Sequence, residues 1–315
     1  MKSDYNHLES LYWVFTQVCN DQCNHCYNLS GPQGEKITED DCIAIINNLP
    51  DQIDRIILSG GEPLAEKHKL FLILDHLKDR YGGTPTQIML QTNGDLLNEN
   101  SLDLLIEKGV TRFDIASIDR FHKHKGERLS VLSKLFQSRG VSGEEKDPLI
   151  EKENYLHQNN LSWGYWGATD DMWLGGNWAR GRAMQTNLWR KDAKHNFCQI
   201  LSGARNFLGG YQDIPQEISI QLWKINPCCP GTLYPLGDAR IQKVAEVLTQ
   251  NSKSKIMQAL NQGKPLLMGE HLGIDRQTAA QRAEKLENIC LYCDSFFREN
   301  LEELNTETFI PLPQV

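Results

Sequence analysis

The stretch LYWVFTQVCNDQCNHCYN, residues 11–28, joins an apolar run to three closely spaced cysteines. Its first part, LYWVFTQ, is short, aromatic and β-branched, which predicts a buried strand over 11–17. Cys19, Cys23 and Cys26 follow with the spacing C-x3-C-x2-C. Three thiolates on one short loop can converge on a soft metal centre. Because no fourth cysteine is near in the sequence, a 4Fe–4S cluster held here would keep one iron open to another ligand.

Zinc is the alternative occupant of this cysteine group. A zinc site usually has a two-residue spacing and takes a fourth Cys or His as ligand. His25 is the nearby histidine, and it lies between two of the cysteines. The spacing therefore favours a cluster and leaves zinc open.

The composition of the whole chain is that of an ordinary globular protein. It has 315 residues, of which 40% are hydrophobic and 23% charged, with a formal net charge of −8. The acidic balance argues against a dedicated nucleic-acid surface, and no run approaches the roughly 20 apolar residues of a membrane helix. The beginning, MKSDYNHLES, has no apolar signal region. We therefore expect a cytoplasmic protein without nucleic-acid or membrane partners.

Strand and helix patterns alternate through the first half of the chain. Further strands are predicted in DRIILSGGEP, TQIMLQTNG, VTRFDIASID and LSWGYWGAT, with amphipathic helices between them. Such repeats imply a parallel sheet, either barrel-like or doubly wound, with its chemistry at the carboxyl ends of the strands. The cysteine loop, SGGEP, QTNG and SIDR all follow predicted strands. Residues 140–160 are polar and acidic, which predicts a surface loop.

A second set of cysteines lies late in the chain. Cys198 comes first, NPCCPG contains Cys228 and Cys229, and Cys290 and Cys293 form a C-x2-C pair. Four of these thiolates, with either Cys228 or Cys229 included, make a closed ligand set for a second cluster. A structural zinc ion has the same ligand count. The remaining cysteine, at position 42, lies on the apolar side of a predicted helix and is expected in the core.

The first cysteine group and SGGEP together resemble the signature of the radical S-adenosylmethionine (SAM) superfamily. The two motifs stand one βα unit apart, an aromatic residue follows the third cysteine, and the resemblance covers roughly residues 11–185. It implies a partial (βα)6 TIM-like barrel and a 4Fe–4S cluster on Cys19, Cys23 and Cys26, whose open iron binds SAM. The residues that it implies for contacts with SAM are His25, Tyr27, Gly60, Gly61, Glu62, Asn93, Ser117 and Asp119.

The late cysteines are similar to the twitch and SPASM extensions of that superfamily. GRA at 181–183 precedes the first of them, and PCC precedes LGD. Because no cysteine follows Cys293, the resemblance favours the shorter twitch form with one auxiliary 4Fe–4S cluster. It implies a barrel over 1–185, a small α+β auxiliary-cluster domain over 186–300 and an extended tail over 301–315. The implied ligands are Cys198, Cys228, Cys290 and Cys293.

The resemblance implies a radical SAM oxidoreductase. Such an enzyme reductively cleaves SAM to a 5′-deoxyadenosyl radical, abstracts a hydrogen atom from a small-molecule substrate and passes an electron to the auxiliary cluster. A flavodoxin- or ferredoxin-type protein would donate the first electron. Two alternatives stay open. One is a maturase that modifies a ribosomally made peptide by crosslinking, thioether formation or epimerisation. The other is a non-enzymatic metal-binding or electron-carrier protein.

Four further residues are candidates for a role in catalysis or substrate binding, and two of them also have a simpler explanation. Cys229 could return a hydrogen atom to a substrate radical, although a free cysteine is commonly a buried bystander. His122 could accept a proton, although it stands in a charged stretch typical of an exposed loop. Arg180 and Arg182 could meet a carboxylate of SAM or of the substrate.

Overall fold

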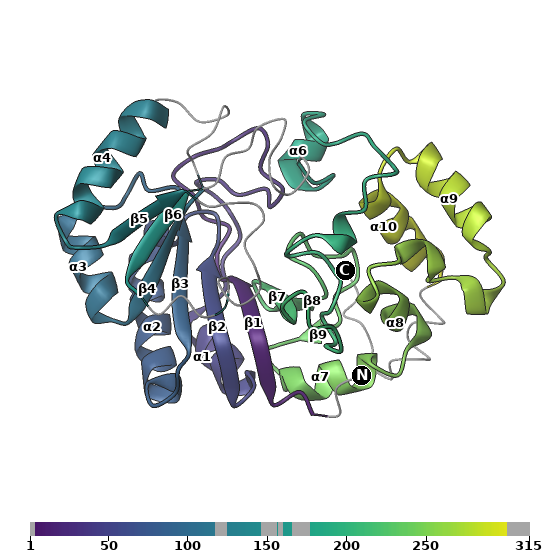
Figure 1. The fold of residues 1–315 in the computed structure, drawn as a ribbon, viewed down its shortest axis with the longest axis horizontal. Coiled ribbons are helices and arrows are strands. Elements are labelled where there is room, and N and C mark those ends of the chain that lie inside the picture. The colour runs from purple at the N-terminus through teal and green to yellow at the C-terminus, as the bar shows by residue number, and fades with distance from the viewer. Residues whose placement is uncertain (1–3, 117–124, 146–155, 157–159, 166–176, 301–315) are drawn as a thin grey trace.

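A computed structural model describes residues 4–116, 125–145, 156, 160–165 and 177–300. In this part of the chain nine strands form one sheet in the order β5-β6-β4-β3-β2-β1-β7-β8-β9 (Figure 1). Every pair from β5 to β7 is parallel, whereas β8 and β9 continue the sheet in antiparallel fashion. The strands are β1 His7–Val14, β2 Gln52–Ser59, β3 Gln87–Thr92, β4 Val110–Ile115, β5 Ser142–Glu145, β6 Ser162–Tyr165, β7 Glu217–Gln221, β8 Lys224–Asn226 and β9 Gly237–Asp238.

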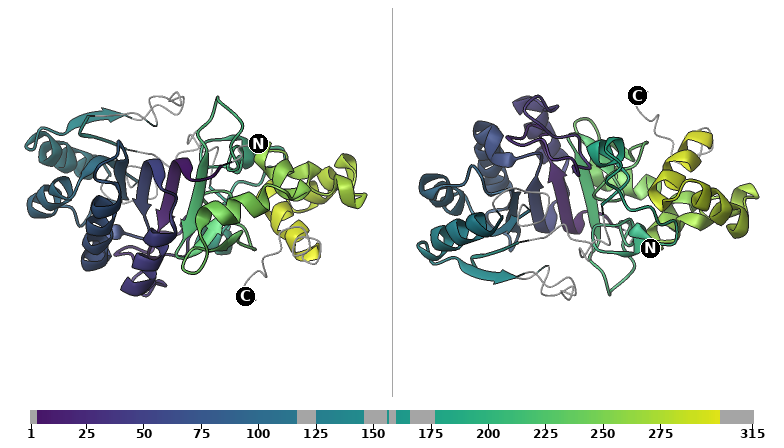
Figure 2. Two further views of the ribbon diagram at one scale, coloured as in Figure 1. Left: turned by 90° about the horizontal axis from the view of Figure 1, so that it is seen from below. Right: turned by 90° about the horizontal axis from the view of Figure 1, so that it is seen from above.

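The helices lie in two groups. Figures 1 and 2 show α1 to α4 along one side of the curved sheet and α7 to α10 gathered beyond its β7–β9 end. The α-helices are α1 Glu39–Asn48, α2 Lys67–Tyr81, α3 Glu99–Glu107, α4 Lys125–Gln137, α6 Gly181–Gln185, α7 Val244–Asn251, α8 Lys255–Asn261, α9 Arg276–Lys285 and α10 Ile289–Glu299. Short 3-10 helices are η1 Pro63–Glu66, η2 Phe197–Gln199, η3 Pro265–Leu267 and η4 Glu270–Leu272. None of the helices in the described ranges is both long and apolar enough to cross a membrane.

The predicted α/β class with a parallel sheet is confirmed, and two local predictions need correction. The first strand spans His7–Val14 rather than residues 11–17, because its pairing with β2 runs from His7 opposite Gln52 to Val14 opposite Ser59. The predicted loop over 140–160 contains a strand, β5, which pairs with β6 at the edge of the sheet. A four-residue polar edge strand carries no apolar alternation, so its sequence resembles a loop.

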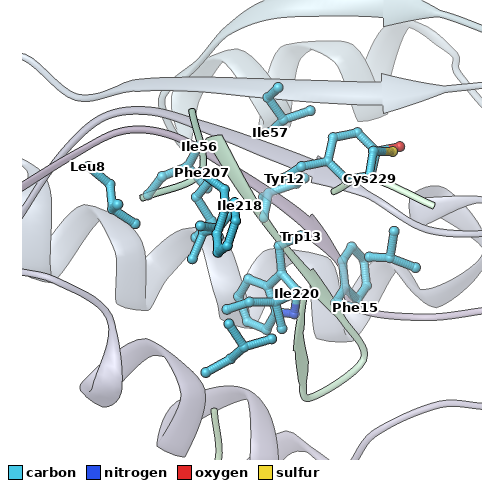
Figure 3. Close-up of a cluster of buried hydrophobic side chains, with 14 of the residues drawn as sticks. Leu8, Tyr12, Trp13, Phe15, Ile56, Ile57, Phe207, Ile218, Ile220 and Cys229 are labelled. Atoms are coloured by element: carbon cyan, nitrogen blue, oxygen red, sulfur yellow. The ribbon is translucent and has the colours of Figure 1, made fainter. Parts of the chain in front are cut away.

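Part of the hydrophobic core lies where β1 meets β7 (Figure 3). Trp13 is fully buried, and its indole Nε1 donates a hydrogen bond of 3.1 Å to the carbonyl of Leu222. Its ring packs edge-on against Phe15, and Ile220 of β7 lies beside it. Because side chains alternate along a strand, Trp13 and Phe15 face this core while Tyr12 faces the opposite side of the sheet. This alternation places Tyr12 where the strand-end loops meet.

Candidate functional site

The loop that carries the first cysteines closes on itself directly after β1. Thr16 pairs with Lys36, and Val18 pairs with Gly31, so the two limbs of the loop run side by side. The amide of Cys19 donates a hydrogen bond of 2.9 Å to the carbonyl of Gly31. These backbone contacts hold the loop at the carboxyl end of the sheet.

A cavity opens between this loop and the ends of β1, β2 and β3. Tyr12 and Ser59 lie on its strand side. Cys19 is buried, whereas Cys23 and Cys26 are half-buried in the cavity wall. The lining contains eight of the residues expected from the sequence: Cys19, Cys23, Cys26, His25, Tyr27, Gly60, Gly61 and Asn93. Three segments that are far apart in the sequence therefore meet at one place.

Glu62 takes a different position from its neighbours Gly60 and Gly61. It is fully buried beside the cavity, not in its lining. Its carboxylate accepts hydrogen bonds from the Asn93 amide at 2.8 Å, the Leu64 amide at 3.0 Å and the Thr92 hydroxyl at 2.7 Å. Burial raises the pKa of Glu62 to about 7, although these hydrogen bonds oppose the rise. Glu62 thus ties the SGGEP loop to the end of β3, and its predicted contact with SAM stays a prediction.

Replacing Glu62 by glutamine is expected to change how the stability of the metal-free protein depends on pH. A raised pKa means that the fold favours the protonated carboxyl, so its stabilising contribution is complete below about pH 4.5 and is lost as the pH rises through about 7. Relative to Glu62→Gln, which does not titrate, the wild type should lose about 3 kcal/mol of unfolding free energy between pH 4 and pH 8, at about 1.4 kcal/mol per pKa unit. Urea unfolding at a series of pH values measures the difference.

The exposed Glu107 at the end of α3 supplies the matched control. Glu107→Gln should follow the wild-type pH dependence. A Glu62→Gln variant that also follows the wild-type curve, apart from a constant offset, would show that the buried carboxyl does not titrate in this range.

Two tyrosines connect the cavity with Cys229. The hydroxyl of Tyr12 donates to Gln91 Oε1 and lies 2.8 Å from Ser59 Oγ. The hydroxyl of Tyr27 lies 3.4 Å from that of Tyr12 and 3.5 Å from the sulfur of Cys229. Figure 3 shows this sulfur beside the hydroxyl end of Tyr12. Burial raises the pKa of the Cys229 thiol to about 12, so the group is a neutral thiol at pH 7.

The other late cysteines form a separate group. Cys198 lies on η2, Cys228 follows β8, and Cys290 and Cys293 lie about one turn apart near the start of α10. Burial raises the pKa of Cys228, and the nearby Cys198 and Cys290 raise it further. Burial also raises the pKa of Cys293, and the nearby Asp294, Cys198 and Cys228 raise it further. The four thiols are thus electrostatic neighbours, whereas the sulfur of Cys229 faces the tyrosines.

In the described ranges, no three Cys, His, Asp or Glu side chains converge closely enough to ligate a single metal ion. Ligands of one ion must meet around one point, whereas the four irons of a 4Fe–4S cluster each take their own thiolate. Cluster ligands therefore stand farther apart than zinc ligands.

Arg180 and Arg182 bind within the chain. The sequence suggests a carboxylate of SAM or substrate as their partner, but Arg180 forms an ion pair with Asp294 at 3.0 Å. Arg182 donates to the backbone carbonyls of Cys23 and Ser30. The physical reason is that neighbouring chain segments already supply the carboxylate and carbonyl oxygens that accept hydrogen bonds from these two guanidinium groups.

Three predicted residues lie outside the described residues, namely Ser117, Asp119 and His122. Cys42 is fully buried on α1, as expected.

The part of the site that sequence reasoning missed is the group around Tyr12. Two signals pointed to it: the alternation of the first strand places Tyr12 opposite Trp13, and Gln91 belongs to the QTNG motif.

Residues 13–121 match the model of the Radical SAM superfamily. The chain contains a radical SAM domain. The matched residues include the end of β1, the strands β2 to β4 and the loops that line the cavity.

Two curated archaeal proteins, both uncharacterised, are 30% identical to this chain over part of its length. The match to the Methanocaldococcus jannaschii protein extends over 125 residues, which is 37% of this chain and 43% of that protein. The match to the Archaeoglobus fulgidus protein extends over 107 residues, 33% of this chain and 24% of that protein. Each match thus spans less than half of the relative.

Two solved structures share the fold around the radical SAM domain. The crystal structure of BtrN in complex with AdoMet and 2-DOIA has 14% sequence identity and a TM-score of 0.51, covering 81% of this chain and 88% of BtrN. Native anSMEcpe with bound AdoMet and Kp18Cys peptide has 14% identity and a TM-score of 0.50, covering 96% of this chain and 100% of anSMEcpe. At such low identity the likeness concerns the fold alone.

Proposed function

We propose that the chain is a radical SAM enzyme that oxidises a small molecule with the help of a second cluster. The observation that carries this proposal is the cavity in which Cys19, Cys23 and Cys26 meet Gly60 and Gly61 inside the radical SAM domain. When bound, the cluster and SAM supply a 5′-deoxyadenosyl radical that abstracts a hydrogen atom from the substrate. The remaining roles belong to residues of the chain.

The residues around the cavity fit a cluster and SAM. Three thiols on one loop leave one iron of a 4Fe–4S cluster without a protein ligand. Ser30 Oγ and Asn28 Nδ2 also belong to lining residues, and they are buried without a hydrogen-bond partner in the described structure. Burial raises the pKa of the Cys19 thiol to about 11, so cluster binding must release its proton.

The chain would orient SAM through its strand-end loops. Gly60 and Gly61 offer backbone carbonyls to the SAM ammonium group, because they line the cavity without side chains. Asn93 would be a polar contact, and its position is fixed by a hydrogen bond of 2.9 Å from its Nδ2 to Asn20. His25 and Tyr27 would lie against the adenine. Glu62 would act indirectly, because its carboxylate accepts the hydrogen bond from the Asn93 amide and so holds Asn93 in place.

The second cluster would be held by Cys198, Cys228, Cys290 and Cys293. Support comes from the electrostatic influence among these four thiols, of which Cys290 and Cys293 are buried and Cys198 and Cys228 are half-buried. Cys228 suits this role better than Cys229, because the sulfur of Cys229 lies against Tyr27. A cluster with four protein ligands has no open iron, so its role would be to accept the electron of the substrate radical. A flavodoxin- or ferredoxin-type protein would supply the electron that starts the cycle.

One observation favours a second candidate, a reaction that returns a hydrogen atom. The neutral thiol of Cys229 lies within 3.5 Å of a tyrosine that lines the cavity. A thiol at this place suits epimerisation, in a small molecule or in a peptide matured by the enzyme. BtrN was crystallised with a small molecule and anSMEcpe with a peptide, so both substrate classes are represented among proteins of similar fold.

Cys229→Ala separates the two candidates. If the reaction is an oxidation, the variant should retain turnover within about threefold of the wild type, and product formed in D2O should carry no deuterium at the reacting carbon, because no thiol proton enters it. Mass spectrometry of the product measures this. Deuterium in the wild-type product, lost together with turnover in Cys229→Ala, would establish hydrogen return.

The function itself is tested on anaerobically reconstituted protein. We expect about eight irons and eight sulfides per chain, as two 4Fe–4S clusters require, and 5′-deoxyadenosine after addition of SAM and dithionite. Zinc in place of iron, or intact clusters without 5′-deoxyadenosine, would favour the metal-binding or electron-carrier alternative instead.

A further inference from the structure

Helix α6 holds the first cysteine loop by its backbone. Arg182 Nη1 donates to the carbonyl of Cys23 at 2.8 Å, and Nη2 donates to the carbonyl of Ser30 at 2.7 Å. The backbone amides of Arg182 and Ala183 both donate to the carbonyl of Cys26, at 2.8 and 3.1 Å. Carbonyl oxygens on both limbs of the loop are thus bound by one short segment from late in the chain.

The contact is too close for any residue except glycine at its start. Gly181 has the left-handed φ of +52°, and a Cβ atom there would lie 2.3 Å from the carbonyl oxygen of Tyr27. One helical turn later, the hydroxyl of Thr186 donates to the carbonyl of Asn24 at 2.7 Å. The segment therefore lies against the loop from residue 181 to residue 186.

Arg180 reaches the second cysteine group from the same segment. Its Nη1 and Nη2 each lie 3.0 Å from one carboxylate oxygen of Asp294, which directly follows Cys293 on α10. Nη2 also lies 3.5 Å from the carbonyl of Cys290. Figure 1 shows α6 between the strand-end loops of the sheet and α10. Arg180 thus binds the second cysteine group, and Arg182, two positions later, binds the first.

We infer that residues 180–186, here called the clamp, position the first cysteine loop for its cluster and couple it to the second cysteine group. Arg182 suits this role because a planar guanidinium presents two parallel donors, which a lysine ammonium does not. Its charge beside the loop also favours the reduced, more negative state of a bound cluster and so raises the reduction potential. Arg180 and Arg182 are positioning residues. The spectroscopic consequence rests on the proposed function, whereas the effect on the loop does not.

The first test uses the metal-free protein. Arg182→Gln removes both charge-assisted hydrogen bonds to the loop, so amide hydrogen exchange of Cys19 and Cys26 should become about tenfold faster or more. Arg182→Lys keeps the charge but only part of the hydrogen bonding and should be intermediate. Arg282→Gln is the matched control, because Arg282 on α9 pairs with Glu299 on α10 rather than with the first cysteine loop. It should leave exchange in the loop unchanged.

The second test uses reconstituted protein. The cluster at the first group is identified as the one whose electron paramagnetic resonance signal changes on addition of SAM. A redox titration should find a lower potential for this cluster in Arg182→Gln than in the wild type, and partial recovery in Arg182→Lys. Arg180→Gln should instead change the signal that does not respond to SAM. Loss of iron to a chelator should be faster from the first cluster in Arg182→Gln.

The outcomes separate the clamp from the proposed function. Wild-type loop exchange in both Arg182 variants overturns the clamp, and so does an unchanged potential of the SAM-responsive cluster. If Arg182→Gln does not fold, Arg182→Lys decides by the same two measurements. Failure of the wild-type protein to bind iron overturns the proposed function, while exchange in the metal-free chain still decides whether the clamp holds the loop.

Discussion

Cys23→Ala is expected to halve the iron content of the reconstituted protein and to abolish SAM cleavage. The loop supplies three thiolates to its cluster, and removal of one leaves two, which is too few to hold four irons. Iron should fall from about eight to about four per chain, because the second group keeps its own ligands. Production of 5′-deoxyadenosine should fall by more than the roughly 100-fold that loss of an outer-shell partner can cause. Iron analysis and chromatography of the nucleoside measure both effects.

Cys42→Ala is the control for this substitution. Cys42 is as buried as any residue of the core, yet it lies on α1 rather than in either cysteine group. The variant should keep its iron and its SAM cleavage, with a modest loss of stability from the small void that remains. Full iron content and activity in Cys23→Ala would contradict the assignment of the first cluster.

Gly61→Ala is expected to separate the SGGEP loop from the cysteine loop. A Cβ atom at residue 61 would lie 2.5 Å from the carbonyl oxygen of Val18 and 2.7 Å from that of Gln17. Both atoms belong to the backbone that leads into the cysteines, so the loops must move apart. That movement would break the 2.7 Å hydrogen bond from the Gly61 amide to Thr16 and the 2.8 Å bond from the Glu62 amide to Val18.

The expected loss is about 3–5 kcal/mol of unfolding free energy, since overpacking costs about 1–3 kcal/mol and each of the two lost hydrogen bonds about 1 kcal/mol. SAM affinity should fall at least about tenfold, because the carbonyls of the loop no longer face the cavity. Urea unfolding and calorimetric titration with SAM measure the two quantities. Gly83→Ala is the control, because a Cβ atom there meets nothing within 4 Å. Equal behaviour of the two variants would show that the two loops do not require their close contact.

Sequence reasoning placed the residues that line the cavity together because the decisive information is local. Each loop that lines the cavity follows a strand whose apolar run is visible in the sequence, and parallel strands bring their carboxyl ends to one edge. The cysteine spacing and the glycines of SGGEP then identify these loops as unusual. No knowledge of long-range packing is needed for Cys19, Cys23, Cys26, Gly60 or Gly61 to be placed together.

What the sequence did not predict depends on contacts between distant segments. The partner of Arg182 is a pair of backbone carbonyls, and no residue type in the sequence marks a carbonyl as available. The ligand count alone left Cys228 and Cys229 open, and no sequence pattern indicates that the sulfur of Cys229 lies against Tyr27, more than 200 positions earlier. The pairing of β7 with β1 is of the same kind, because the short alternating sequence EISIQ of β7 carries no record of its neighbouring strand.

That last pairing has a consequence for how the two halves of the molecule depend on each other. Strand β1 is bordered by β2 on one side and by β7 on the other, so its amides and carbonyls on the second side are satisfied only when residues 217–221 are present. The indole of Trp13 likewise has its acceptor in the later half, at Leu222. The later half is therefore not an interchangeable module. A C-terminal segment taken from another protein would replace it only if that segment supplied a strand in the same register as β7 and a backbone carbonyl at the position of Leu222.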